Sequence, residues 1–336
     1  MKIVNINSVS KKDNFEDFLN WLQDDLNSVN KLILENLTNS SSLISDLSNH
    51  IINSGGKRIR PLLTLAVAKL CGYTGSRHLI LASVIEYIHT ATLLHDDVVD
   101  NSRKRRGKKT ANIIWGNEFS VLAGDFLFAQ SFELMVETGS LEALSSLATA
   151  SCKITQGEFQ QMQIANKPDT SIEDYFDVIG KKTAELFGAS CQSGITLAGG
   201  NQNQQIAAYD YGFNLGLAFQ IIDDLMDFSQ SSNKMGKNLG DDFKLGKTTL
   251  PIILVWQKSD QKEKSFWNRT LVDLNQKPSD LKTALEILDK YNVFSECKNI
   301  AIEFVNKSLK SIEIFSDSII KDHLKGLASE SINRSR

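Results

Sequence analysis

The sequence predicts an all-helical protein that forms a single domain over residues 1–336. Three observations favour this fold class. Only four prolines occur in 336 residues, long segments carry apolar residues at helical spacing, and no β-rich run stands between turn-forming residue pairs. With 41% apolar residues, the chain can bury a substantial core. We therefore expect a bundle of helices.

The expected helices follow one another along the chain. Residues 14–52 are predicted as two amphipathic helices that end at the break Ser54-Gly55-Gly56. The next helix begins at Pro61, because a proline in the first turn costs no hydrogen bond, and it ends at Leu70. Further helices are expected at residues 78–100, 116–137, 140–164, 171–198, 203–228, 248–257, 279–290 and 295–332. Polar residues and glycines predict a loop over residues 229–250, which we expect to serve as an active-site lid.

Composition and charge narrow the possible functions. The formal net charge of -3 provides no general attraction to nucleic acid or to an anionic membrane. The four cysteines lack C-x-x-C spacing, so we expect reduced thiols and neither a zinc site nor a disulfide framework. The first residues lack a signal-peptide core, and Glu86 and His89 interrupt the apolar segment 79–94. These features predict a cytoplasmic protein without a transmembrane segment.

Two acidic runs are the most informative motifs of the chain, Asp96-Asp97-Val98-Val99-Asp100 and Asp223-Asp224-Leu225-Met226-Asp227. The first and last aspartates of each run are four residues apart, which places them on one face of a helix. Each run follows an apolar segment, so we expect both in a cleft. Another Asp pair, Asp24-Asp25, lacks the third aspartate and is predicted to be a solvated surface feature. The two runs together predict a cage of carboxylates.

A carboxylate cage needs a cation, because like charges four residues apart destabilise a helix and a buried carboxylate needs a partner. Oxygen donors without an adjacent Cys or His pair point to Mg²⁺. Magnesium keeps several waters and binds through a few carboxylates plus substrate phosphates. The sequence therefore predicts a diphosphate ligand together with its metal ions.

Two basic segments provide cations that can face the acidic runs. The first, Gly55 to Arg60, combines glycines, which allow close backbone approach, with arginines, whose planar fork suits phosphate oxygens. The second, Arg103 to Lys109, has six cations in seven positions. Alone, the first is equally typical of a solvated turn, and the second of a nucleic-acid or targeting patch. The place of the second directly after Asp100 favours a grip on diphosphate.

The chain resembles the all-trans polyprenyl diphosphate synthases, class I prenyltransferases with an all-helical fold, and within them the octaprenyl-forming members that make the ubiquinone side chain. The likeness is carried by ordered motifs, namely GGKRIRP at 55–61, EYIHTATLLHDDVVD at 86–100, RRGKKTAN at 105–112, GDFLFAQSF at 124–132, KTAELF at 182–187, FQIIDDLMDF at 219–228, and GKNLGDD with GKTTLP up to Pro251. This resemblance implies an isoprenoid-synthase helical bundle with a central cavity, and a homodimer.

The resemblance also implies a role for each matching residue. Mg²⁺, three ions per active site, would be bound by Asp96, Asp97, Asp100, Asp223, Asp224 and Asp227. The allylic diphosphate would in addition contact Arg105, Lys182, Thr183, Gln220, Lys237 and Lys247. Isopentenyl diphosphate would be held by Lys57, Arg60, His89 and Arg106. The catalytic set would be Asp96, Asp97, Asp100, Asp223, Asp224, Lys182 and Lys247. From the residues alone, His89 is equally a packed core histidine, and the Lys182-Thr183 and Lys247-Thr248 pairs are equally surface features.

The chemistry fits these residue types. Diphosphate leaves an allylic carbon when its developing charge is neutralised by metal ions and fixed cations. The double bond of isopentenyl diphosphate then attacks the allylic cation, and a proton is lost. No side chain is a strong candidate for the base, so we expect the released diphosphate to take this proton.

Product length depends on the residues below the first acidic run. Ala91 and Thr92 lie about 6 to 8 Å before Asp96 along a helix, and both are small, whereas short-chain members of the family place aromatic residues there. This predicts an open tunnel and an octaprenyl product, with nonaprenyl and decaprenyl left open. Phe128, Phe132 and Met135 recur at helical spacing and would close the tunnel, or would be plain core. Such a product is hydrophobic and would pass to a membrane.

Four other functions are compatible with parts of the pattern. His95-Asp96 resembles a ligand pair of His-Asp phosphohydrolases, but the other histidines lack a matching context. A class I terpene cyclase would share the fold and the first run, but not the second aspartate pattern. A catalytically silent partner subunit would be expected to lose one acidic run, and this chain keeps both. A shorter-chain farnesyl or geranylgeranyl diphosphate synthase would share all the motifs and differ in the tunnel.

Overall fold

The structure is a computed structural model that describes residues 15–38, 44, 46, 56–228 and 239–333. Apart from one short hairpin, its regular elements in these ranges are helices, so the all-helical prediction is confirmed. The N-terminal half contains α1 (Phe15–Trp21), α2 (Gln23–Thr38), α4 (Ile59–Leu70), α5 (Arg77–Val99), α6 (Ala111–Trp115), α7 (Asn117–Glu137) and α8 (Leu141–Ile164). The C-terminal half contains α9 (Ile172–Ile179), the π-helix η2 (Gly180–Ala184), α10 (Glu185–Leu197), α11 (Gln202–Met226), α12 (Asp241–Lys244), α13 (Leu250–Lys258), α14 (Gln261–Trp267), the π-helix η4 (Asn268–Val272), α15 (Asp280–Lys290), α16 (Val293–Ser311), the short 3₁₀ turn η5 (Ile312–Ile314) and α17 (Ile319–Ser331).

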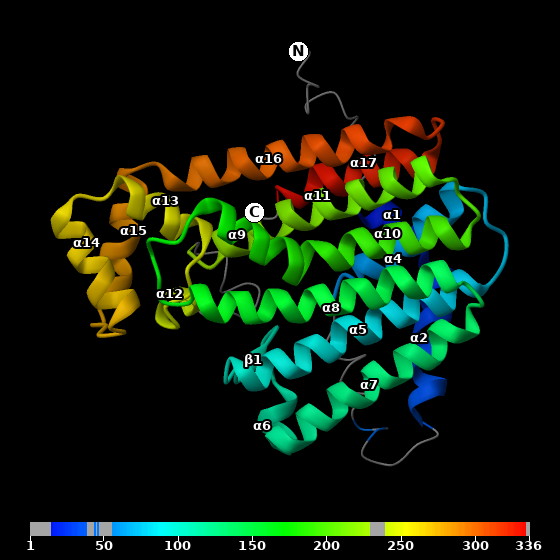
Figure 1. The fold of residues 1–336 in the computed structure, drawn as a ribbon, viewed down its shortest axis with the longest axis horizontal. Helices are drawn as coiled ribbons and strands as arrows, with labels where there is room; N and C mark the ends of the chain where they lie inside the picture. The colour runs from blue at the N-terminus through cyan, green and yellow to red at the C-terminus, as the bar shows by residue number, and fades with distance from the viewer. Residues whose placement is uncertain (1–14, 39–43, 45, 47–55, 229–238, 334–336) are drawn as a thin grey trace.

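The long helices pack against one another, α16 on α11, α11 on α10, α10 on both α8 and α5, and α5 on α7, with α16 and α7 at opposite edges in Figure 1. Helix α10 lies at the centre and contacts α4, α8 and α11. A helix that is buried on nearly all sides needs small residues where its neighbours approach. A Cβ at Gly212 of α11 would lie 2.3 Å from the Phe187 carbonyl oxygen, and one at Gly194 of α10 would lie 2.7 Å from the Thr64 carbonyl oxygen. These glycines therefore set the close packing around α10.

The basic segment after α5 is a hairpin, whereas the sequence predicted a loop. Strands β1 (Lys104–Arg105) and β2 (Lys108–Lys109) pair antiparallel, with Arg105 opposite Lys108. The two turn residues, Arg106 and Gly107, have φ of 52° and 78°, as a two-residue type I′ turn requires. Strands of two residues are too short to show alternation, and Arg-Gly is not a typical turn pair, so no strand was predicted here.

Two predicted helices are divided in the structure. The segment 171–198 consists of α9, η2 and α10, with the π-helical turn at Gly180 to Ala184. The prediction of one helix over residues 295–332 was wrong, because α16 ends at Ser311 and α17 begins after Ser318. The Ser318 hydroxyl caps α17 by accepting a hydrogen bond from the Lys321 backbone N–H at 3.2 Å. Helix α14 was not predicted. The single-domain organisation stays a prediction.

The expected lid falls partly outside the described residues. Of residues 229–250, the structure describes those from 239 onward, and they include the short helix α12. In the part of the chain that is described, one helix, α7, is long and apolar enough to cross a membrane by length and composition, with 39% of the tested window buried. A core or interface helix of a soluble protein passes the same test.

Candidate active site

The first acidic run lies at the C-terminal end of α5, as predicted. Asp96 and Asp97 occupy its last turn, and Asp100 is the residue that caps it. Asp97 is only 4% exposed, and its Oδ1 accepts hydrogen bonds from Arg105 Nη2 at 2.7 Å and Arg105 Nε at 3.0 Å. Its backbone carbonyl accepts from Asn112 Nδ2 at 3.1 Å. The buried carboxylate thus fastens the basic hairpin to the end of α5.

The other two carboxylates of this run face lysines from distant segments. Lys182 Nζ lies 3.9 Å from Asp96 Oδ2, and Lys247 Nζ donates to Asp100 Oδ2 at 3.0 Å. Lys247 also lies 3.4 Å from Asp242 Oδ1. Burial lowers the pKa of Lys247, but attraction to Asp242 and Asp100 outweighs it and raises the pKa above its usual value. Burial raises the pKa of Asp96, against the opposing effect of Lys182.

The second acidic run ends α11, with Asp227 as the capping residue. Asp223 is half-buried, whereas Asp224 and Asp227 are 5% and 2% exposed. Asp224 Oδ2 accepts from the Tyr175 hydroxyl at 2.7 Å and its Oδ1 accepts from Gln220 Nε2 at 2.7 Å. Asp227 Oδ2 accepts from the Asp242 backbone N–H at 3.0 Å, and its carbonyl accepts from Gly240 N at 2.8 Å. The second run is therefore connected to α9 and to the start of α12.

The π-helical turn η2 presents Lys182 and Thr183 next to both runs. Lys182 Nζ donates to Glu158 Oε2 at 2.6 Å, and the Thr183 hydroxyl donates to Gln220 Oε1 at 2.8 Å. The turn fits because a glycine faces it: a Cβ at Gly157 would lie 2.6 Å from the Lys182 backbone nitrogen. Single π-helical turns occur frequently at functional sites. The π-helical turn thus directs Lys182 toward Glu158 and Thr183 toward Gln220.

A second group of cations lies around the start of α4. Arg60 Nη1 lies 3.1 Å from His89 Nε2, and the Arg60 guanidinium stacks 4.4 Å from the centroid of the Phe187 ring. Burial lowers the pKa of Arg60 to about 10, partly offset by Glu86. Burial and the neighbouring Arg60 hold the pKa of His89 well below its usual value. We therefore expect His89 to be neutral and Arg60 charged at neutral pH.

Gly56 and Glu86 order this region. Gly56 has φ of 150°, a backbone conformation that favours glycine, and the Arg106 guanidinium lies close to it. Arg58 pairs with the Glu86 carboxylate, and Glu86 is 8% exposed. The structure thus brings Arg60, His89 and Arg106 to the same part of the molecule, as the sequence predicted.

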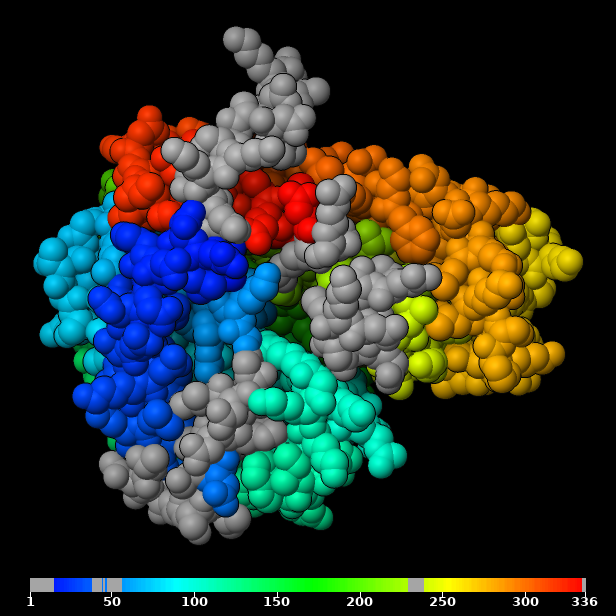
Figure 2. Space-filling view, turned by 180° about the vertical axis from the view of Figure 1, so that it is seen from behind, coloured from blue at the N-terminus to red at the C-terminus, as the bar shows by residue number. Residues whose placement is uncertain are grey.

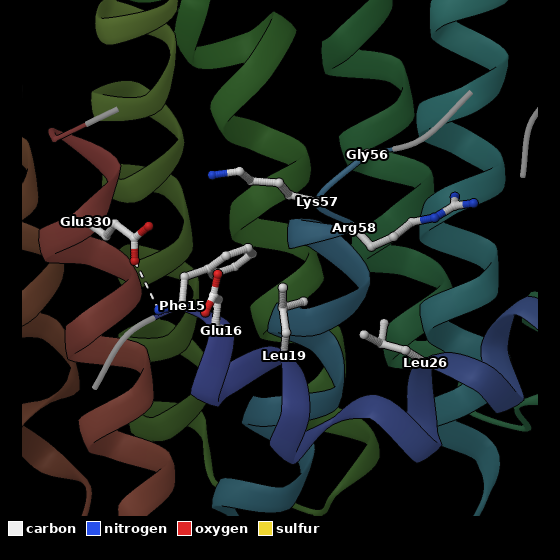
Figure 3. Close-up of a pocket in the computed structure, with 8 residues that line it drawn as sticks. All are labelled: Phe15, Glu16, Leu19, Leu26, Gly56, Lys57, Arg58 and Glu330. Carbon is white, nitrogen blue, oxygen red and sulfur yellow. Dashed lines mark hydrogen bonds between the residues drawn. The ribbon is translucent and has the colours of Figure 1, made fainter. Parts of the chain in front are cut away.

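Lys57 lies beside a cavity of about 430 Å³ (Figure 3). The cavity is lined by Phe15, Glu16, Leu19, Leu26, Gly56, Lys57, Arg58 and Glu330. Lys57 Nζ lies 5.0 Å from the centroid of the Phe15 ring, and Glu330 Oε2 accepts from the Phe15 backbone N–H at 3.1 Å. On the face shown in Figure 2, the surface is hollowed between the N-terminal helices and the C-terminal half of the chain.

The residues predicted to set product length lie on α5 and α7, which pack together. Ala91 is buried, and the Thr92 hydroxyl donates to the His89 carbonyl at 2.8 Å. The Phe128 and Phe132 rings meet edge to face at 5.2 Å, and Phe132 is 39% exposed. Met135, by contrast, is buried, and the tunnel itself stays a prediction. Lys237 lies outside the described residues.

Sequence reasoning missed four side chains that contact the site: Glu86, Glu158, Tyr175 and Asp242. Glu86 lies inside a recognised motif, so its buried pairing could have been suspected. Asp242 ends the GKNLGDD motif, so its contact could also have been suspected, whereas Glu158 and Tyr175 lie in stretches with no distinctive spacing. Their contacts depend on helices that come together only in the fold.

Comparisons with known proteins agree with this geometry. The family model described as polyprenyl synthetase matches residues 41–288. The octaprenyl diphosphate synthase of Escherichia coli (strain K12) is 39% identical over 323 residues, which cover 96% of this chain and 100% of the relative.

Solved structures show the same fold over nearly the whole chain. A polyprenyl synthase from Caulobacter crescentus CB15, complexed with calcium and isoprenyl diphosphate, matches with a TM-score of 0.93 and 40% identity, over 97% of this chain and 100% of that one. A decaprenyl diphosphate synthase from Rhodobacter capsulatus matches with a TM-score of 0.91 and 41% identity, over 96% and 100%. The protein therefore belongs to the polyprenyl synthetase family and is a trans-prenyltransferase of the long-chain polyprenyl type.

Proposed function

We propose that this protein condenses isopentenyl diphosphate successively, head to tail, onto an allylic diphosphate, with farnesyl diphosphate as the primer and octaprenyl diphosphate for a quinone side chain as the product. One observation carries the proposal. The first aspartate run is met by cations from three separate segments, namely the hairpin, η2 and the segment before α13. The second run, on another helix, is joined to η2 through Gln220 and Thr183. This arrangement of carboxylates and fixed cations suits a diphosphate bound together with metal ions.

Magnesium fits the donor set. Among the described residues, no group of three or more His, Cys, Asp or Glu side chains is placed to hold a metal alone. Mg²⁺ binds through a few carboxylates completed by water and substrate phosphates, so such a group is not required. Asp96, Asp100 and Asp223 are the half-buried members of the runs, and we propose them as principal ligands, with Asp97, Asp224 and Asp227 in support. Bound Mg²⁺ supplies neutralisation of the charge on the leaving diphosphate.

The cations divide between two substrates. Arg105, Lys182 and Lys247 lie against the first acidic run and would bind the allylic diphosphate, with Thr183 and Gln220 as uncharged donors and Lys237 as a further contact. Lys57, Arg60, His89 and Arg106 would hold isopentenyl diphosphate. Fixed positive charges suit this task because they need no reorganisation when the negative charge develops.

The bond changes follow from this placement. The allylic carbon–oxygen bond breaks, the double bond of isopentenyl diphosphate forms the new carbon–carbon bond, and the released diphosphate takes the proton that is lost. His89 Nε2 lies 3.1 Å from Arg60 Nη1, and we propose that both residues bind the anion. We accordingly propose no side chain as the base.

Product length is proposed to depend on the small side chains of α5. Because Ala91 is buried one turn before the first acidic run, Ala91→Phe should place a ring in the path of a growing chain and shorten the product. Chromatography of dephosphorylated products from the two proteins measures this. Thr92→Ser is the control with a small residue retained. An unchanged product from Ala91→Phe would refute this placement of the tunnel.

Helix α7 is proposed to form the homodimer interface. It exposes Val121 by 40%, Leu122 by 68% and Val136 by 68%, and a helix that exposes several large apolar side chains needs a cover. A second copy in the cytoplasm would cover this face, and the hydrophobic product would pass on to a membrane. Light scattering of the purified protein measures the oligomeric state.

The first experiment is incubation with Mg²⁺, farnesyl diphosphate and radiolabelled isopentenyl diphosphate. A ladder of products ending near octaprenyl is expected, and chelation of Mg²⁺ should abolish it. A fifteen- or twenty-carbon end point would indicate a shorter-chain synthase, and no incorporation would favour a silent partner subunit.

A further inference from the structure

Four side chains from three helical segments form one continuous chain of hydrogen bonds beside the site. The Thr183 hydroxyl donates to Gln220 Oε1 at 2.8 Å, Gln220 Nε2 donates to Asp224 Oδ1 at 2.7 Å, and the Tyr175 hydroxyl donates to Asp224 Oδ2 at 2.7 Å. Thr183 lies on η2, Tyr175 on α9, and Gln220 and Asp224 one turn apart on α11. These hydrogen bonds therefore link the π-helical turn to the second acidic run.

The carboxylate fixes the direction of every bond in this chain. Both Asp224 oxygens accept hydrogen bonds, one from the Tyr175 hydroxyl and one from the Gln220 amide nitrogen, so the amide presents its nitrogen to Asp224. Its oxygen is then turned to Thr183, whose hydroxyl donates to it. The amide keeps a second N–H, a donor suited to a phosphate oxygen. Without Asp224, the Gln220 amide would be free to rotate to the opposite orientation.

Tyr175 holds the carboxylate in place. Tyr175 is 2% exposed, and its ring lies 5.5 Å from that of Phe176. Asp224 is 5% exposed and Thr183 is 7% exposed, so little water reaches these bonds. Hydrogen bonds in such surroundings strengthen one another, and a buried polar group that lacks a hydrogen-bond partner destabilises the folded protein. The Tyr175 hydroxyl is thus the fixed end of this series of hydrogen bonds.

We propose that Tyr175 is a positioning residue for the allylic diphosphate: through Asp224 it orients Gln220 and Thr183, and Asp224 acts as the link in this chain rather than as a principal metal ligand. The inference rests on the proposed function, because it assigns these side chains to the allylic substrate. It adds a residue outside both acidic and basic motifs, and it separates the tasks of the adjacent aspartates Asp223 and Asp224.

Tyr175→Phe tests the proposal, with Tyr211→Phe as the matched control. Tyr211 is also fully buried, and its hydroxyl donates to the Leu324 carbonyl at 2.8 Å, in the scaffold. Tyr175→Phe should raise the KM for farnesyl diphosphate about 3- to 10-fold, as expected for one lost hydrogen bond. The KM for isopentenyl diphosphate and the half-saturating Mg²⁺ concentration should change less than twofold. Tyr211→Phe should leave all three within twofold.

A second pair of variants keeps the test decisive if Tyr175→Phe does not fold. Asp224→Asn places an amide where Gln220 donates its hydrogen bond, so this variant should selectively weaken the binding of farnesyl diphosphate. Asp223→Asn should instead raise the half-saturating Mg²⁺ concentration. The inference is overturned if Tyr175→Phe and Asp224→Asn leave farnesyl diphosphate binding unchanged, or if Asp224→Asn shifts the Mg²⁺ requirement as much as Asp223→Asn.

Calorimetric binding of farnesyl diphosphate with Mg²⁺ separates this inference from the proposed function. If the wild-type protein binds farnesyl diphosphate but forms no product, the proposed reaction fails, while selective weakening by Tyr175→Phe still supports the positioning role. If the wild type forms product and Tyr175→Phe binds farnesyl diphosphate equally well, the positioning role fails alone.

Discussion

The two acidic runs have the same spacing and the same place at the end of a helix, but their partners differ in kind. Carboxylates of the first run meet charged groups: Arg105 binds Asp97, Lys182 lies near Asp96 and Lys247 binds Asp100. In the second run, the described hydrogen bonds come from neutral donors, a tyrosine hydroxyl and a glutamine amide at Asp224 and a backbone N–H at Asp227.

This difference indicates a division of labour. Carboxylates paired with cationic side chains can exchange those partners for metal ions and diphosphate, because both members of each pair suit the incoming ligand. Carboxylates buried among neutral donors instead brace the surrounding helices. The first run is therefore expected to contribute most to catalysis, and the second run to contribute through Asp223 together with its bracing role.

The largest expected effect comes from removing charge in the first run. Asp96→Asn combined with Asp100→Asn should lower kcat at least about 10² to 10³-fold, because charge stabilisation in the transition state is lost. Incorporation of labelled isopentenyl diphosphate measures this. Asp24→Asn, on the exposed side of α2, is the control and should match the wild type. A loss of less than tenfold in the double variant would remove the distinction between the runs.

A smaller effect is expected from Arg105→Lys. The variant keeps the charge but cannot reproduce both hydrogen bonds to Asp97, because lysine lacks the planar fork. The hairpin should lose its anchor, and kcat/KM for farnesyl diphosphate should fall about tenfold, the equivalent of roughly 1.4 kcal/mol. Arg103→Lys, at an exposed position before the hairpin, should have no effect. Equal behaviour of the two variants would show that charge alone suffices at residue 105.

The smallest effect concerns stability and pH at the second run. Burial, with a further contribution from Asp242, raises the pKa of Asp224 to about 7 from its usual value of 3.8. Because the folded pKa lies above the unfolded one, the native state binds more protons between these values. The contribution of this group to stability is present below the unfolded pKa and is lost as pH rises toward 7.

Asp224→Asn removes this titration. Without Mg²⁺, the free energy of unfolding of the wild type should fall relative to Asp224→Asn between pH 5 and pH 7, by up to about 1.4 kcal/mol per pH unit. Denaturant unfolding at several pH values measures the difference, and Asp24→Asn should follow the wild type. Parallel curves for wild type and Asp224→Asn would mean that the pKa of the Asp224 carboxyl is not raised in the folded protein.

Particular residues show how far the sequence could be interpreted. Apolar periodicity and the scarcity of proline predicted the helices on either side of the site, with ends within a few residues for α5, α7 and α8. Periodicity did not show the π-helical turn, because a five-residue turn is too short to change the apolar spacing of the whole segment, and the turn packs against Gly157 of another helix. The break between α16 and α17 was also missed, since it contains neither Gly nor Pro.

The sequence by itself determined the acidic and basic residues of the site, because their spacing and order carry the chemistry of metal and diphosphate binding. Only the tertiary structure decided which carboxylate faces which donor. Tyr175 and Glu158 reach the site from helices that are distant in sequence, and no local pattern predicts those contacts. Hydrogen-bond partners depend on positions to within tenths of an ångström, and packing of whole helices sets those positions.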